Sequence, residues 1–180
     1  MKTEKKAWNE FLKPIVVLVV ICLVTSTLLA VTNSVTAPII AEKAQGAAGE
    51  ARRALLPDAD KFVPVEGVDI PGVTDVYKAE NGAGVVITAE ASGYGGPVPV
   101  MVAFGADGSI AAVKFLENSE TPGLGQKVLE EGFGAQFSGK AAQPMTLADI
   151  DAISGATISS TAAVNAINSA IAAYGQVKEG

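Results

Sequence analysis

The longest hydrophobic stretch of this chain lies close to its N-terminus. No charged residue occurs from Pro14 to Ala41, and the apolar run PIVVLVVICLVTSTLLAV lies inside this window. A helix needs about 20 predominantly apolar residues to cross a bilayer, so the run is long enough to do so. The pattern predicts a single N-terminal transmembrane helix over residues 14–35.

The residues before this run predict its orientation. Residues 1–13 hold four lysines and two glutamates, and basic flanks favour the cytoplasmic side. We expect a cytoplasmic tail over 1–13, one pass through the inner (plasma) membrane in contact with its lipid, and an extracytoplasmic C-terminal part. A cleaved signal peptide is the alternative, with VTA at 35–37 as its cleavage site. Pro38 would obstruct cleavage, and the run exceeds the about 7–15 residues of a signal core, which favours a retained anchor.

The pattern changes after the apolar run. Small and apolar residues now keep three- and four-residue spacing, and Pro57 ends the segment. This spacing predicts a helical stalk or linker over residues 36–60, although Gly46 and Gly49 weaken the helical pattern.

Residues 61–180 show strand patterns first and helical patterns later. Runs at 73–79, 84–89, 98–104 and 110–116 predict strands, and the Asp-Gly of GADGS between the last two predicts an antiparallel hairpin. Helical spacing follows at 126–132 and 161–174. This order favours an α+β domain, with antiparallel strands and flanking helices, over a doubly wound parallel sheet.

Two absences in the composition restrict the chemistry. The chain has no histidine, and its only cysteine, Cys22, lies inside the predicted membrane helix. This excludes Ser-His-Asp and Cys-His catalysis, histidine-ligated haem, nearly all zinc sites and, in the outer domain, disulfides and iron–sulfur clusters. We expect no catalytic residue and no metal site, so redox chemistry would need an organic cofactor. The net charge of −6 argues against nucleic acid as a partner.

Two glycine-containing loops have both a structural and a functional interpretation. In SETPGLGQK (119–127), Thr-Pro-Gly-Leu is typical of a type II turn. As a ligand loop it would offer close backbone approach at Gly123 and Gly125, and the side chain of Leu124 for an aromatic ring. GYGGPVPV (93–100) is either a flexible loop before a strand or a loop whose Tyr94 stacks on a ring.

The segment DAISGATISST (151–161) concentrates small hydroxyl residues just before a helical pattern. Ser159, Ser160 and Thr161 all suit a helix N-cap, so a closely packed, capped helix start explains the segment. A helix start also offers unpaired N–H groups that suit a phosphate. Neither a P-loop nor a GxSxG nucleophile motif is present.

In combination, these motifs resemble a known family. SGAT at 154–157 is similar to the S(T)GAT signature of the FMN-binding domain family. ETPGLG at 120–125, GYGG at 93–96 and one N-terminal span resemble, in the same order, the G subunit of the Rnf electron-transport complex. Many relatives have a histidine just before ETPGLG, where this chain has ENS (117–119).

The resemblance implies a covalent flavoprotein. It implies that FMN is attached by a phosphoester to Thr157, which would make the chain a phosphoprotein, and that the other cofactor-binding residues are the following: Ser154, Gly155, Ala156, Glu120, Thr121, Gly123, Leu124, Gly125, Tyr94, Gly95 and Lys140. A threonine hydroxyl is a poor nucleophile without a base or metal, and the family precedent is a separate flavin transferase, which would be a partner during maturation.

The implied function is electron relay within an ion-translocating ferredoxin:NAD oxidoreductase, a translocase, alongside its other membrane and redox subunits and without independent turnover. The C subunit of a sodium-translocating NADH:quinone reductase, or another membrane-anchored FMN electron-transfer protein, is the alternative within this class. A non-redox extracytoplasmic binding or scaffold module is the alternative outside it.

Overall fold

The computed structural model describes residues 12–179. The chain divides into two compact units, Met1–Ala48 and Gly49–Gly180, and helix α2 (Lys13–Leu55) contributes to both. The helix continues through Gly46 and Gly49, the two residues that weaken the sequence pattern. It ends two residues before Pro57 because the residue that precedes a proline disfavours helical geometry.

The N-terminal part of α2 has the length and composition of a membrane span. Among the described residues, Lys13–Pro38 is the one helical segment that is apolar enough, with a mean hydropathy of 2.8. The hydroxyls of Thr25, Thr27 and Thr32 donate to carbonyls four residues earlier at 2.9, 2.7 and 2.9 Å. These polar side chains are therefore satisfied inside the helix without water, as a bilayer requires.

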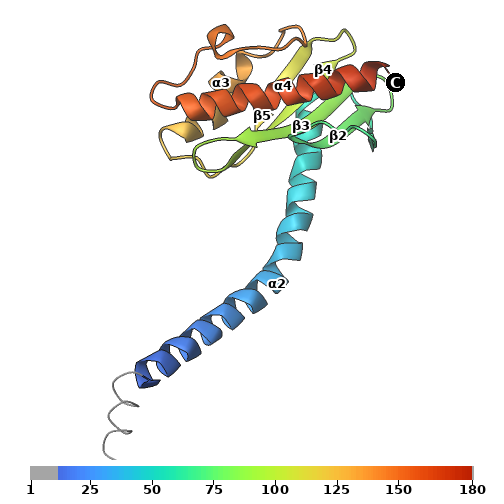
Figure 1. Ribbon diagram of the computed structural model, residues 1–180. Helices are drawn as coiled ribbons and strands as arrows, with labels where there is room; N and C mark the ends of the chain where they lie inside the picture. Colours follow the sequence, from blue (N-terminus) through green and yellow to red (C-terminus); the bar gives the residue numbers. More distant parts are fainter. Residues whose placement is uncertain (1–11, 180) are drawn as a thin grey trace, which may run out of the picture. The chain divides into compact units, whose positions relative to one another are not determined.

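A five-stranded antiparallel sheet forms the centre of the unit Gly49–Gly180 (Figure 1). Its strands pair in chain order: β1 (Phe62–Pro64), β2 (Val73–Ala79), β3 (Gly84–Ser92), β4 (Pro97–Gly105) and β5 (Ile110–Phe115). The four predicted strands and the antiparallel hairpin between β4 and β5 are confirmed. The sequence pattern missed β1, because this strand has three residues and lies among prolines and glycines.

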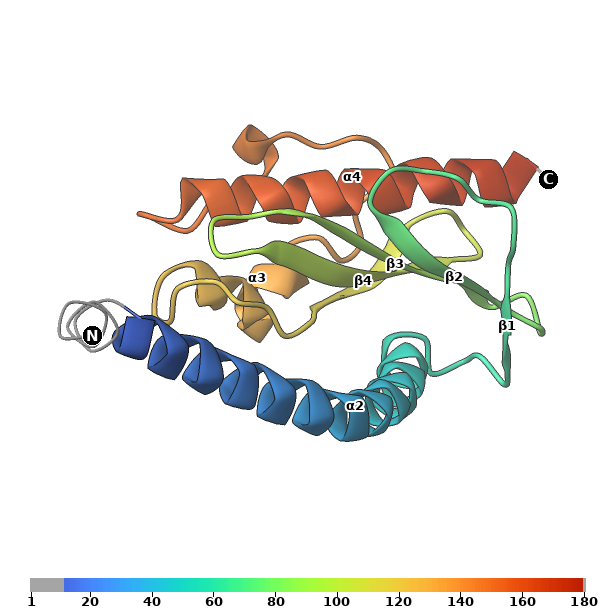
Figure 2. The same ribbon diagram turned by 60° about the horizontal axis from the view of Figure 1, so that its bottom comes forward.

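Helix α4 (Thr157–Glu179) crosses one face of this sheet (Figures 1 and 2). Its buried face carries several alanines, which allow the helix axis to approach the strands closely. Ile87 and Phe104 of the sheet meet Ile167 of the helix in one core, and the ring of Phe104 stacks on Tyr174 with centroids 4.5 Å apart. The α+β fold predicted from the order of strands and helices is confirmed.

The predicted helix at 126–132 is wrong as a single element. The chain forms a 3-10 helix, η2 (Gly125–Leu129), and then a short helix, α3 (Glu131–Ala135). Glu130 between them is extended, with φ −66° and ψ 135°. This break lets Phe133 pack against Phe115 and Phe137, with ring centroids 5.4 and 5.8 Å away. A further 3-10 turn, η3, covers Leu147–Asp149.

The last turn of α2 packs on the opposite face of the sheet from α4. Tyr77 pairs with Val86, the neighbour of the α4-facing Ile87, so its side chain points to the other face. The guanidinium of Arg52 lies 3.7 Å from the centre of the Tyr77 ring. This cation–π contact holds the end of α2 against the sheet.

Candidate functional site

The SGAT segment forms a turn that leads directly into α4. The N–H of Ala156 donates to the carbonyl of Ile153 at 3.0 Å, and Gly155 has a φ of +80°, a conformation that glycine adopts without a Cβ penalty. Thr157 is the first helical residue and is exposed. The turn therefore presents the Thr157 side chain at the very start of the helix.

The three hydroxyl residues after this turn are not N-caps, so that prediction is wrong. They lie inside the first turns of α4, because the helix begins at Thr157. The Ser160 hydroxyl accepts the N–H of Ile153 at 3.0 Å, and the Thr161 hydroxyl donates back to the Thr157 carbonyl at 2.8 Å. The start of the helix is thus held by side chains that lie within it.

The start of α4 keeps backbone donors available. Within α4, the first backbone N–H with a hydrogen bond is that of Ser160, which donates to the Ala156 carbonyl at 2.9 Å. Within the described residues, the N–H groups of Thr157, Ile158 and Ser159 have no partner of this kind. Free N–H groups and the partial positive charge at a helix start favour an anion.

A second wall comes from the segment between β5 and η2. The N–H of Leu124 donates to the carbonyl of Thr121 at 3.1 Å, and Gly123 has a φ of +73°. These two observations confirm the turn predicted for Thr-Pro-Gly-Leu, with glycine where φ must be positive. The turn leaves the side chain of Leu124 45% exposed.

Glu120 connects this wall to the other two segments. One carboxylate oxygen, Oε1, accepts the backbone N–H groups of Tyr94 at 2.8 Å and Gly95 at 3.0 Å. The other oxygen, Oε2, accepts the hydroxyl of Ser159 at 2.6 Å. The side chain is 2% exposed. One buried carboxylate therefore holds loop 93–96, the segment after β5 and the first turn of α4 together.

The hydrogen bonds of Glu120 determine its ionisation. Burial, the largest influence, raises the pKa of the carboxyl, but the Ser159 hydroxyl and the N–H groups of Gly95 and Tyr94 together lower it more. The net pKa lies below the ordinary value. Glu120 is accordingly an ionised carboxylate at neutral pH.

This ionisation predicts an acid sensitivity of the domain. Because the pKa is lower in the folded chain, the stabilisation by Glu120 is complete above its ordinary pKa and is lost as the pH falls through the folded pKa. The melting temperature should fall between neutral pH and a pH below the folded pKa of Glu120, and this fall should be smaller in Glu120→Gln than in the unmodified chain. The exposed, neighbouring Glu117→Gln variant serves as the control, and an equal loss in all three chains would contradict the prediction.

The three segments enclose a cavity of about 550 Å³, within the range of small-molecule sites. Its lining consists of Tyr94, Glu120, Thr121, Leu124, Gly125, Gly155, Ala156, Thr157, Ile158 and Ser159. Tyr94 is 73% and Ile158 56% exposed. Two large apolar side chains beside Leu124 around one cavity indicate a surface that an apolar ligand would cover.

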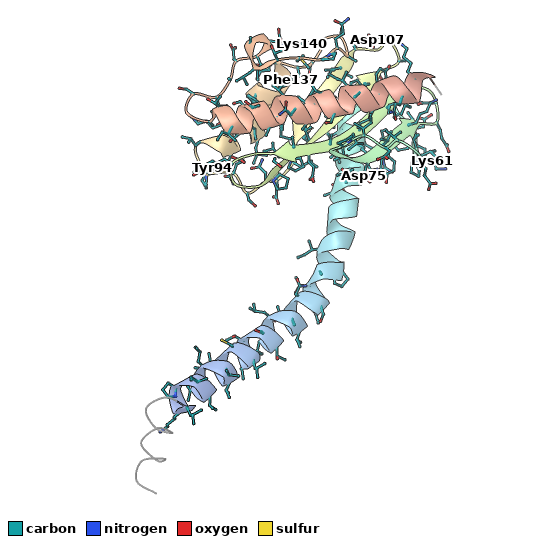
Figure 3. All side chains as sticks on the ribbon, in the orientation of Figure 1. Lys61, Asp75, Tyr94, Asp107, Phe137 and Lys140 are labelled. Carbon is teal, nitrogen blue, oxygen red and sulfur yellow. The ribbon has the colours of Figure 1, made fainter. Side chains whose placement is uncertain are left out.

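The structure brings eight of the twelve predicted site residues to this cavity. Gly95 and Gly123 do not line it but belong to the two loops beside it, where Gly95 donates its N–H to Glu120 and Gly123 has the positive φ of the turn. Ser154 lines another cavity of about 340 Å³. Lys140 lies elsewhere: its ammonium donates to the Asp149 carbonyl at 2.6 Å, and Figure 3 shows it well apart from Tyr94.

Sequence reasoning misses Ile158 and Ser159 as lining residues, and it interprets Ser159 only as a cap. The signal is present, because an isoleucine directly after the SGAT segment and a serine two residues after Thr157 share the helix start with that threonine.

Comparisons with known proteins agree with this geometry. A model of the FMN-binding domain matches residues 93–172, a range that includes every residue lining the cavity. The class defined by the fold and the site is thus the FMN-binding domain proteins.

The relatives restrict this class further, because they are G subunits of ion-translocating complexes. The chain is 32% identical over 164 residues to the G subunit of the proton-translocating ferredoxin:NAD(+) oxidoreductase complex of Clostridium ljungdahlii, covering 86% of both chains. It is 32% identical over 203 residues to the G subunit of the Na(+)-translocating ferredoxin:NAD(+) oxidoreductase complex of Acetobacterium woodii, covering 97% of this chain and 98% of the relative. It is 35% identical over 176 residues to the G subunit of the ion-translocating oxidoreductase complex of Methanosarcina acetivorans, covering 91% and 94%.

The chain belongs to the family of G subunits of ion-translocating oxidoreductase (Rnf) complexes, which confirms the resemblance seen in its motifs. Among solved structures, the C subunit of the Na(+)-translocating NADH-quinone reductase from Parabacteroides distasonis is similar, with a TM-score of 0.48 and 22% identity over 58% of this chain and 60% of that one.

Proposed function

We propose that this chain carries FMN, attached covalently to Thr157 through a phosphoester, and relays electrons within an ion-translocating ferredoxin:NAD oxidoreductase complex. The observation that carries the proposal is the position of Thr157. It is an exposed hydroxyl at the start of α4, in the wall of a cavity that two other segments of family-like sequence complete.

The residues of the cavity fit FMN by their chemistry. The free N–H groups at the start of α4 suit the phosphate, since they meet an anion with partial positive charge. The apolar side chains of Leu124, Ile158 and Tyr94 suit the planar ring system, which is amphipathic and large. FMN bound here would supply the electron-transfer chemistry, for which the chain has no other group of its own.

The chain's residues have binding and positioning roles in this proposal. Thr157 would hold the phosphate end, and the turn at Gly155 keeps the backbone open beside it. Glu120 and Ser159 fix the cavity walls relative to one another. Because the walls are fixed, the protein would rearrange little when the charge of bound FMN changes.

The surroundings of Thr157 support the proposal that another protein forms the bond. Within the described residues, its hydroxyl has no hydrogen-bond partner, and no histidine exists in the chain to act as a base. An unactivated threonine hydroxyl is a poor nucleophile. We therefore assign Thr157 as the substrate of a separate flavin transferase.

The N-terminal helix supports a location in the membrane. We propose that Lys13–Pro38 is retained as a single-pass anchor in the inner (plasma) membrane, with the basic tail cytoplasmic and the FMN-binding domain extracytoplasmic. A noncovalent FMN lost on that side would not be replaced, so a covalent bond retains it. The other membrane and redox subunits of the complex are the partners for electron transfer.

Mass spectrometry tests the proposal. The full chain is expressed with and without a flavin transferase and purified in detergent. With the transferase, the intact mass should rise by one FMN less one water, and the denatured gel band should show flavin fluorescence. A protein isolated from its native membrane with an unmodified mass and no flavin would overturn the proposal.

A further inference from the structure

Glu120 places a negative charge in the wall of the cavity, and the described residues supply no cation to neutralise it. The side chain lines the cavity and is 2% exposed. Among the described residues, the salt bridge that the structure shows is Lys61–Glu80, on the surface. The charge of Glu120 is therefore not cancelled by an ion pair.

The groups that contact this carboxylate are neutral donors. Two are backbone N–H groups, of Tyr94 and Gly95, and the third is the Ser159 hydroxyl. Such dipoles stabilise the ionised form without removing its net charge. The backbone N–H groups of Tyr94 and Gly95 can only donate, and they bind a carboxylate more strongly than a neutral carboxyl, so the geometry favours the carboxylate.

We infer that Glu120 is a potential-setting residue, whose fixed charge in the cavity wall lowers the reduction potential of bound FMN. This inference rests on the proposed function, because it concerns the same cavity. Glu120 acts on the flavin through its charge, and its hydrogen bonds go to the protein.

The physical reason is electrostatic. Reduction adds electrons to the flavin, and added negative charge is disfavoured beside a fixed anion. The effect is larger in a partly buried site than in water, because the effective dielectric constant is lower there. Protein groups near a flavin tune its electronic properties in this way.

Two variants test the charge separately from the structure. Glu120→Gln removes the charge while its side chain keeps an oxygen for the Tyr94 and Gly95 amides and an NH₂ group for the Ser159 oxygen. Ser159→Ala removes one donor and leaves the carboxylate charged and less compensated. Glu117→Gln removes a charge from an exposed position three residues away and is the matched control.

The measurement is the midpoint potential of each flavin-loaded full-length chain in detergent at neutral pH. We expect an upward shift for Glu120→Gln, a downward shift for Ser159→Ala and no shift for Glu117→Gln. If Glu120 only held the cavity walls together, the two substitutions would not shift the midpoint potential in opposite directions. An unchanged or lower potential in Glu120→Gln, or a higher or unchanged one in Ser159→Ala, would overturn the inference. If Glu120→Gln takes up no FMN, the Ser159→Ala result decides alone.

A second readout needs no flavin. In the Thr157→Ala chain, backbone amides of the peptide spanning 93–98 should exchange with deuterium more slowly than in the Thr157→Ala/Ser159→Ala double variant. In the double variant Glu120, which binds the amides of Tyr94 and Gly95, has lost its hydrogen bond to α4. Equal exchange rates in the two chains would contradict the role of the Ser159–Glu120 hydrogen bond in holding loop 93–96. An unmodified mass in the parent chain contradicts the proposed function, whereas a loaded parent chain with unshifted variants contradicts only the inference about Glu120.

Discussion

Replacement of Thr157 by alanine should abolish the proposed covalent attachment of FMN and, with it, electron transfer by the complex that contains this subunit. The proposed phosphoester requires the Thr157 hydroxyl, and within the described residues that hydroxyl makes no hydrogen bond whose loss would disturb the fold. The melting temperature of the flavin-free protein should therefore remain close to that of the parent chain. Intact mass and in-gel fluorescence measure the loss of flavin, and assays on isolated membranes measure the loss of electron transfer.

Thr161→Ala is the matched control for this experiment. Thr161 is also exposed and lies one turn further along the same helix, where its hydroxyl donates to the Thr157 carbonyl. This variant should retain the full mass increase. Thr157→Ser retains a hydroxyl at the same position and should retain part of the loading. Full flavin loading in Thr157→Ala would show that the bond is formed elsewhere.

A methyl group at Gly125 should disrupt the cavity from within. An ideal Cβ at this position would collide with Glu120 Oε2 and with the Ser159 hydroxyl, the two groups of the buried hydrogen bond. Separation of this pair leaves a buried carboxylate short of a donor. We expect Gly125→Ala to lower the free energy of unfolding by about 1.5–3 kcal/mol, the range for a hydrogen bond to a charged group, and to reduce flavin loading. Chemical denaturation and intact mass measure the two effects.

Gly132→Ala is the control for Gly125→Ala. Gly132 lies in α3, and apart from its chain neighbours and the backbone of the helix no atom lies within 4 Å of an ideal Cβ at this position. Alanine is favoured over glycine in a helix by up to about 1 kcal/mol, so this variant should be as stable as the parent chain or slightly more stable. Equal stability and loading in both variants would refute the close packing around Glu120.

Individual elements show which parts of this fold the sequence can predict. The strands at 73–79, 84–89, 98–104 and 110–116 are predictable because β-branched residues and turn glycines are local signals. The start of α4 and the break at Glu130 cannot be predicted from such local signals. In both places long-range packing selects among several locally acceptable conformations, as the contacts of Phe133 show.

The candidate site divides in the same way. Thr157, Leu124 and Tyr94 are found from the sequence because each lies in a short motif with its own local signature. The role of Ser159 as a hydrogen-bond donor to Glu120 cannot be found from the sequence, because Glu120 is 39 positions earlier. No local pattern reports a contact over that distance.

By itself, the sequence determined three properties of this protein: an apolar N-terminal helix, an α+β domain after it, and a composition without histidine and with a single cysteine, which lies in that helix. These follow from composition and from periodicities of a few residues. Only the tertiary structure decided that three distant segments meet around one cavity and that a buried carboxylate joins them. The physical reason is that these contacts exist only when the antiparallel sheet and α4 bring the chain back on itself.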